Sequence, residues 1–286
     1  MKKDTLQDPY ARLYEIDRNI DALDEIIKGG EYILQRSYTE AIAVFDKIIL
    51  EGGVKNSIYA DALNGKALCL YMLNKFPEAL EYTVKLLAID PVKTKWGQAA
   101  SCLYYMDRYE EALKYSEKGL AKDYADIICL LVKADCLYEL SRYDEAIEYY
   151  DKLFKINHDA SLLSSKARCL MNMRRYEEAN EMFDSSLKLG HKSIITLLQK
   201  IYCLCKLSEY EKVLIYCYEA DLLAFEPQYK KLILKYRIIA LTKLERYDEA
   251  TACKNAIKAL PMVGLDNLEV KDISHKIAIL EQLGNS

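Results

Sequence analysis

The chain has 286 residues, of which 51% are hydrophobic and 29% charged, a composition typical of a folded rather than a disordered protein. Its 10 glycines and 5 prolines are too few for the many tight turns of a β-sandwich or barrel, so the composition favours helices. The 40 Lys and Arg against 44 Asp and Glu give a net charge of -4, which argues against nucleic acid as a partner.

The N-terminal segment predicts a helix that begins at Asp8-Pro9, an N-cap residue followed by a proline at the first helical position. Apolar residues then recur every three or four positions up to the Gly29-Gly30 pair. Residues 1–21 are therefore predicted to be an N-terminal capping helix or extension. Two alternatives stay open: a separate helix, or one long first helix that is kinked at the glycines.

The same N-terminal residues contain no targeting signal, because they are polar and lack the apolar run of roughly 7–15 residues that a secretory signal needs. No stretch of the chain approaches the roughly 20 apolar residues that span a bilayer. We therefore expect a cytoplasmic protein that has no membrane among its partners.

A short motif, an aromatic residue followed by any residue, Glu and Ala, recurs along the chain. Its copies begin at Tyr38, Phe76, Tyr109, Tyr143, Tyr176 and Tyr247, and a degenerate copy begins at Tyr210. The successive aromatic residues lie 38, 33, 34, 33, 34 and 37 residues apart. A fixed period of this length is the signature of a repeat architecture.

Each copy of the motif joins two helical patterns. Upstream of Tyr143, for example, apolar residues at helical spacing run from Leu130 to Leu140, and a second apolar stripe runs downstream from Ala146 to Phe154. A short polar turn separates the two stripes. Acidic residues follow the aromatic residue, where they suit the positive end of the second helix. Each copy therefore predicts a helix–turn–helix hairpin.

The fourth copy shows best that these hairpins resemble the tetratricopeptide repeat, with Leu130, Ala134, Tyr143, Ala146 and Tyr150 at the family's large, small and aromatic positions. The resemblance implies an all-α fold: an α-solenoid, coiled as a right-handed superhelix, of about seven hairpins with terminal capping helices. It covers residues 22–262, with repeats at approximately 22–55, 60–92, 93–126, 127–159, 160–193, 194–227 and 231–262. An amphipathic C-terminal segment, residues 263–286, is the predicted second capping helix.

Two ladders of residues accompany the repeat. Cys69, Cys102, Cys136, Cys169 and Cys203 fill one repeat position, and Lys28, Lys66, Lys133, Lys166 and Lys200 fill another. A free cysteine suits a small apolar packing position, and equivalent atoms in neighbouring repeats are too far apart for a disulfide. The lysines predict either a cationic groove or aliphatic stems that lie along the neighbouring helix. We find no metal-ligand spacing and no catalytic motif, and expect neither a cofactor nor an enzyme.

The resemblance implies that the first helix of each hairpin lines a concave groove, and the face beside the apolar stripe gives its residues by spacing. The predicted groove residues are Asn64, Leu68, Tyr71, Gln98, Ser101, Tyr104, Tyr105, Leu131, Asp135, Tyr138, Arg168, Asn172 and Tyr202. Tyrosines offer a large rigid contact area with a polar tip. Gly65 and Gly97 are expected to leave a recess between repeats two and three, walled by Tyr71 and Tyr104.

These features together predict a protein-interaction scaffold that binds a peptide or a segment of a partner protein in this groove. Two alternatives remain: a receptor for a small signalling peptide, and a structural repeat protein that associates with itself. The family's basic clamp for C-terminal carboxylates is missing, since Asn64 and Gly65, then Thr94 and Gln98, occupy two of its pairs of positions. A receptor for chaperone tails is therefore not expected.

Overall fold

The computed structural model describes residues 9–89 and 95–260, with side chains from residue 14 onward. Within these ranges the chain has 14 α-helices and no strand, and it forms two compact units that divide between Ser141 and Arg142. The first unit contains α1 (Pro9–Leu34), α2 (Tyr38–Glu51), α3 (Asn56–Met72), α4 (Phe76–Ile89), α5 (Trp96–Tyr105), α6 (Tyr109–Leu120) and α7 (Ile127–Glu139). The second contains α8 (Tyr143–Asn157), α9 (Ala160–Asn172), α10 (Tyr176–Lys188), α11 (Ile194–Lys206), α12 (Tyr210–Leu223), α13 (Pro227–Lys243) and α14 (Tyr247–Ala259). The predicted C-terminal capping helix, residues 263–286, lies outside the described residues.

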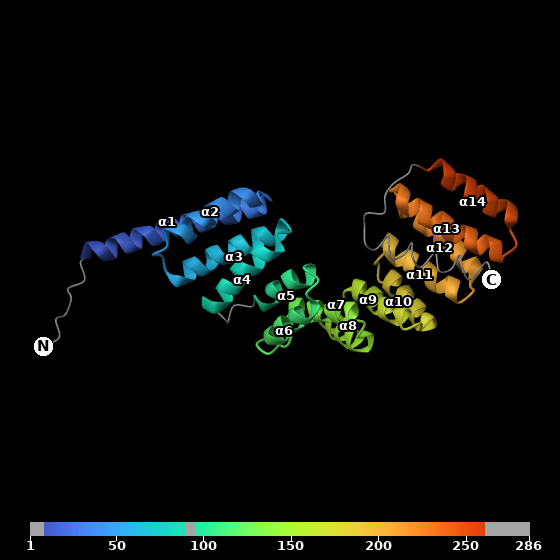
Figure 1. The fold of residues 1–286 in the computed structure, drawn as a ribbon, viewed down its shortest axis with the longest axis horizontal. Coiled ribbons are helices and arrows are strands. Elements are labelled where there is room, and N and C mark those ends of the chain that lie inside the picture. The colour runs from blue at the N-terminus through green and yellow to red at the C-terminus, as the bar shows by residue number, and fades with distance from the viewer. Residues whose placement is uncertain (1–8, 90–94, 261–286) are drawn as a thin grey trace. The chain divides into compact units, whose positions relative to one another are not determined.

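Within each unit, consecutive helices pair into hairpins and each hairpin packs on the next (Figure 1). In the first unit α1 pairs with α2, α3 with α4 and α5 with α6, and the first helices also touch one another, α1 with α3 and α5 with α7. In the second unit the pairs are α9 with α10, α11 with α12 and α13 with α14. The fold is the all-α solenoid that the repeat period predicts.

The N-terminal alternatives resolve in favour of one long helix. α1 continues without interruption from Pro9 to Leu34, through both Gly29 and Gly30. Gly29 is required for packing, because a β-carbon there would lie 2.5 Å from the Phe45 ring of α2. The predicted boundary after residue 21 lies inside this continuous helix.

Small residues allow the paired helices to approach closely. Alanines at the repeat positions of the first helices, such as Ala67 and Ala134, and of the second helices, such as Ala112 and Ala146, are completely buried. The ladder cysteines are completely buried as well, which confirms that their position is a small apolar packing position. The same position of the seventh repeat holds Ala240, which is also completely buried.

The turns between the two helices of a hairpin share one backbone conformation. In all seven copies the residue two positions before the motif aromatic has a positive φ near 60°: Arg36, Asn74, Asp107, Ser141, Arg174, Ser208 and Glu245. The next amide then bonds back to the helix, as Arg175 N–H does to the Leu170 carbonyl at 2.9 Å. This is a Schellman ending, at which glycine is the usual residue. None of the seven is glycine.

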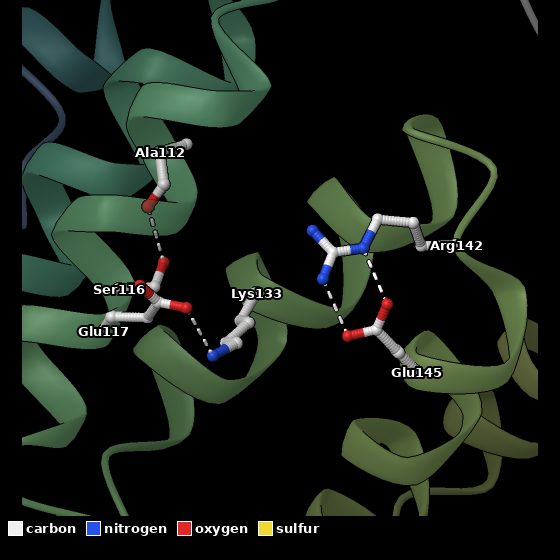
Figure 2. A network of polar contacts seen from close by, with 6 residues as sticks. All are labelled: Ala112, Ser116, Glu117, Lys133, Arg142 and Glu145. Atoms are coloured by element: carbon white, nitrogen blue, oxygen red, sulfur yellow. Dashed lines mark hydrogen bonds and ion pairs between the residues drawn. The ribbon is translucent and has the colours of Figure 1, made fainter.

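The second helices begin with a recurring ion pair. The residue before the aromatic is arginine in four copies, and its guanidinium binds both oxygens of the glutamate three residues later: Arg108–Glu111, Arg142–Glu145, Arg175–Glu178 and Arg246–Glu249. Figure 2 shows the Arg142 pair, with both bonds 2.7 Å long. These pairs are exposed, so each contributes little stability, but they place acids at the positive helix end.

Candidate functional site

Three first helices of the first unit carry ten of the predicted groove residues. α3 supplies Asn64, Leu68 and Tyr71; α5 supplies Gln98, Ser101, Tyr104 and Tyr105; α7 supplies Leu131, Asp135 and Tyr138. These helices provide a hollow of about 400 Å³. It is lined by Leu68, Tyr71, Lys95, Gln98, Ser101, Tyr104, Tyr105, Ile127, Ile128, Leu131, Val132 and Asp135. Eight predicted residues therefore meet around one hollow.

One wall of the hollow is a cluster of aromatic rings. The Tyr105 ring stacks on Phe76 at a centroid distance of 4.8 Å, and Tyr71 meets both rings edge-on at 5.9 and 5.5 Å. Tyr104 lies 5.4 Å from Tyr105 and 5.6 Å from Tyr109. Burial, followed by the effect of Tyr105, raises the pKa of Tyr71, so its hydroxyl stays protonated. The wall is therefore held in place by contacts among its own rings.

The other apolar residues that line the hollow are aliphatic, and most of them are partly exposed. Ile127, Ile128 and Leu131 of α7 are 45%, 53% and 38% exposed, and Leu68 of α3 is 37% exposed. Among the polar lining residues, Ser101 is buried and donates its hydroxyl hydrogen bond to the Gly97 carbonyl at 2.9 Å. The Ser101 hydroxyl is therefore satisfied inside its own helix.

The two glycines do not leave the open recess that was expected beside them. A β-carbon on Gly97 would lie 2.8 Å from Ile128 Cγ2, and one on Gly65 would overlap the Phe45 ring. Both glycines are buried because a neighbouring side chain fills their space. The observed hollow has Tyr71 and Tyr104 among its lining residues as expected, and neither glycine lines it.

Two of the ten residues lie apart from the hollow. Asn64 and Tyr138 are half-buried and do not line it. The Asn64 side-chain oxygen is buried without a hydrogen-bond partner in the described part of the chain, and so is the Gln98 side-chain nitrogen. Buried unpaired amide groups are uncommon, because each costs the free energy of its lost hydration.

The remaining three predicted residues belong to the second unit. Arg168 and Asn172 are half-buried on α9. Tyr202 on α11 is only 7% exposed and meets Tyr176 edge-on at 6.2 Å. Its ring is therefore part of the core of this unit and offers a ligand little surface. The prediction included Tyr202 because helical spacing alone does not separate a surface tyrosine from one just inside the core.

Four residues that line the hollow were not among the predicted groove residues: Lys95, Ile127, Ile128 and Val132. Ile127 and Ile128 begin α7, ahead of the stripe that defined its buried face. The sequence feature that could have predicted them is the pair of isoleucines in the first turn of the helix, directly after the Asp126 N-cap. The Asp126 carboxylate accepts a hydrogen bond from the Cys129 amide at 2.9 Å.

Four of the five lysines of the ladder form ion pairs with the preceding repeat and do not form a cationic groove. Lys133 of α7 binds Glu117 of α6 at 2.9 Å (Figure 2), and Lys166 of α9 binds Asp151 of α8 at 2.8 Å. Lys66 binds Asp46 and the Tyr82 hydroxyl in the same way. In each case the acid lies eight residues after the motif aromatic of the preceding repeat.

Lys200 is the most deeply placed member of this ladder. Its side chain is 1% exposed, and its ammonium lies 3.0 Å from Asp184 and 4.6 Å from the Tyr216 ring centroid. Burial lowers the pKa of Lys200, and the hydrogen bond and charge of Asp184 oppose that shift. Between the second and third repeats the equivalent positions are Val84 and Ala99, so acid and base are absent together.

The cysteines have the chemistry of packing residues. All nine thiols are free, and eight of them are buried. Desolvation raises the pKa of Cys69 to about 11 and those of Cys102 and Cys136 to about 12. A thiol at such a pKa is neither a good nucleophile nor a good metal ligand. Among the residues that the structure describes, no three His, Cys, Asp or Glu side chains are grouped as a metal site would require.

A second hollow, of about 470 Å³, lies between α1, α2 and the segment after α2. It is lined by charged side chains, among them Arg18, Glu25 and Lys47, and the Lys47 ammonium lies 2.8 Å from Glu25. No predicted groove residue takes part in it. None of the helices in the described ranges has both the length and the apolar run that crossing a bilayer requires.

Comparison with known families agrees with this geometry. The family model described as tetratricopeptide repeat matches residues 31–92 and 98–160, which include α2 to α8 except the first two residues of α5, and every residue that lines the hollow except Lys95. The matched residues are tetratricopeptide repeats. Tetratricopeptide repeats are in general protein-interaction scaffolds without catalytic activity of their own. A search of curated protein sequences found no match.

Solved structures similar to this chain share its fold at low sequence identity. A tetratricopeptide repeat protein from Parabacteroides merdae ATCC 43184 matches with a TM-score of 0.66 and 12% identity, covering 90% of this chain and 98% of that one. PilF from Pseudomonas aeruginosa matches with a TM-score of 0.59 and 20% identity, covering 72% and 93%. MamA from Desulfovibrio magneticus RS-1, residues 41 to its end, matches with a TM-score of 0.54 and 13% identity, covering 57% and 94%.

Proposed function

We propose that this tetratricopeptide repeat protein holds an extended segment of a partner protein against α3, α5 and α7, with one apolar side chain of that segment in the hollow. The observation that carries the proposal is the convergence of exposed aliphatic side chains from successive repeats on one aromatic wall. Leu68, Ile128 and Leu131 are each more than a third exposed and line the same hollow. Such a concave site, mostly apolar with a few polar groups, is the usual form of a recognition site.

The mechanism would be preorganisation. The rings of Tyr71, Tyr104 and Tyr105 already contact one another, so an incoming side chain would meet a wall whose rotamers need not be ordered on binding. A cytoplasmic location and the absence of a cofactor belong to the same proposal. The nine free thiols support it, because they are compatible with a reducing compartment.

The test is a panning of a phage-displayed library of random peptides on the full chain. Selected peptides are synthesised, and their affinities are measured for the wild type, for Leu131→Ser and for Ile215→Ser. Ile215 on α12 is exposed and lies in the second unit, so it is the matched control. We expect a shared apolar anchor in the peptides and at least a tenfold loss of affinity in Leu131→Ser alone. Equal affinities for all three proteins would contradict the proposal.

Tyrosine substitutions are poorer probes of the hollow. Tyr71 contacts Phe76 and Tyr105, and Tyr104 contacts Tyr105 and Tyr109, so truncating either ring removes internal packing as well as groove surface. Leu131 is exposed enough for a serine to be tolerated, which makes the loss of binding and the loss of folding separable.

A further inference from the structure

The first helix presents an apolar stripe to solvent. Ile16, Ile20, Leu23 and Ile27 of α1 are 51%, 52%, 47% and 61% exposed. Their spacing of four, three and four residues places all four on one face of the helix. Scattered exposed apolar residues are ordinary, but a continuous row of four large aliphatic side chains over three turns marks a contact surface.

The repeat register shows what covers the same face elsewhere in the first unit. Lys28 of α1 and Lys133 of α7 occupy equivalent positions, so Leu23 and Ile27 correspond to Ile128 and Val132. On α7 this face meets the preceding first helix, α5: Ile128 lies against Gly97, and Val132 is 6% exposed. The Leu23 and Ile27 part of the stripe on α1 therefore corresponds to a surface that borders another helix in α7, where Ile128 is still 53% exposed. Ile16 and Ile20 correspond to Ala121 and Ala125, which precede α7, and so extend the stripe beyond that surface.

The charge beside the stripe indicates which kind of helix fits. Asp17, Asp24 and Glu31 follow one another at intervals of seven residues, so they form a row along one edge of the stripe. All three are exposed, and none has an ion pair among the described residues. A partner helix with basic side chains along the facing edge would pair with this row, since opposite charges at such flanking positions set partner choice.

We propose that this face of α1 docks an amphipathic helix of another protein, which has an apolar stripe bordered by a row of lysines or arginines. The acidic row disfavours antiparallel pairing with a second copy of this chain, because that pairing would set the two acidic rows against each other. It equally disfavours an anionic lipid surface.

The test uses the full chain and a pair of synthetic helical peptides of 21 residues. Both carry leucine and alanine along one stripe; one has lysines along an edge of the stripe, and the other has glutamates at those positions. Fluorescence anisotropy measures binding to the wild type, to Ile20→Ser/Ile27→Ser and to Asp24→Lys/Glu31→Lys. We expect the lysine peptide to bind the wild type at least tenfold more tightly than the glutamate peptide does, and to lose at least tenfold affinity for both variants.

Matched controls separate this surface from general charge attraction and from the hollow. Glu177→Lys/Asp248→Lys changes the net charge by the same amount at exposed positions of the second unit, and Leu131→Ser alters the hollow; neither is expected to weaken peptide binding. Far-UV circular dichroism melts check that every variant is folded. An equal loss in Glu177→Lys/Asp248→Lys would overturn the proposal, as would unchanged binding to Ile20→Ser/Ile27→Ser. A dimer of the wild type that light scattering detects, and that these two serines abolish, would assign the face to a second copy instead.

Discussion

The ring of Phe45 fills the space that a β-carbon on Gly65 would need. Phe45 projects from α2, is 2% exposed, and touches Gly29 of α1 as well as Gly65 of α3. One buried aromatic side chain is thus seated on two glycines from successive first helices. The large residue of one helix and the missing side chains of its neighbours are complementary parts of the same packing unit.

Replacing Gly65 with alanine is expected to lower the free energy of unfolding by about 1–3 kcal/mol, the range for overpacking a filled core. The added carbon would lie within 2.8 Å of three Phe45 ring atoms, and the ring is too enclosed to move aside cheaply. The normal effect of Gly→Ala inside a helix is the opposite, a gain of up to about 1 kcal/mol. Urea denaturation followed by circular dichroism measures the sign.

Gly30→Ala is the matched control for that experiment. Gly30 lies in the interior of α1, and a β-carbon there would meet nothing within 4 Å. We expect this variant to be more stable than the wild type by about 0.5–1 kcal/mol. Stabilisation in both variants would show that the Phe45 ring relocates at little cost.

Lys200 should make stability depend on pH in the alkaline range. Burial lowers the pKa of Lys200 in the folded state below its unfolded value of roughly 10.4. Between these two pKa values the unfolded chain binds more protons, so the contribution of this group to stability rises with pH. We therefore expect the difference in unfolding free energy, wild type minus Lys200→Met, to increase as the pH is raised from 7 to 10.

The difference between the two proteins is the useful quantity here. Buried cysteines with raised pKa values, such as Cys205 at about 12, lower stability above the thiol's unfolded pKa of about 8.5. That loss occurs equally in wild type and variant, so the subtraction removes it. Lys188→Met, at an exposed position of α10, should follow the wild type at every pH. A flat difference for Lys200→Met would contradict the lowered pKa.

The turn at Arg174 should accept glycine with a gain in stability. Arg174 has φ of 61°, a conformation that strains a residue with a β-carbon and leaves glycine unstrained. Arg174→Gly is expected to raise the unfolding free energy by about 0.5–1 kcal/mol. This net gain is the relief of backbone strain in the folded state minus the cost of the larger conformational entropy that glycine has in the unfolded chain. Arg174→Ala removes the same charge but keeps the strain, and a thermal melt that ranks alanine level with glycine would refute the explanation.

The thiols should differ sharply in reactivity. Cys253 on α14 is the one cysteine that is partly exposed, while the other eight are buried. With iodoacetamide at pH 8 we expect mass spectrometry to find one fast modification, at Cys253, and the other eight only after denaturant is added. Cys253→Ser should abolish the fast phase. Rapid modification of a ladder cysteine such as Cys136 would mean that the repeats open locally on the same timescale.

Particular residues show how far spacing could predict the groove. Leu68, Ser101 and Leu131 lie on one face of their helices, so helical spacing alone was enough to predict that they line the same surface. Tyr202 has the same spacing but lies in the core of its unit. The sequence does not decide whether the lysines line a cationic groove or lie along the neighbouring helix, because it does not show which acid lies opposite each lysine.

The sequence by itself predicted the seven hairpins and the small residues at their contacts, because a period of about 34 residues and helical spacing are local properties of the chain. Only the tertiary structure decided that Phe45 fills the space beside Gly65, that Lys133 reaches Glu117, and that α1 is one helix with an uncovered face. These outcomes depend on which side chain of one repeat meets which backbone of the next. Contacts of that kind are set by volume and charge across helices that lie far apart in the sequence.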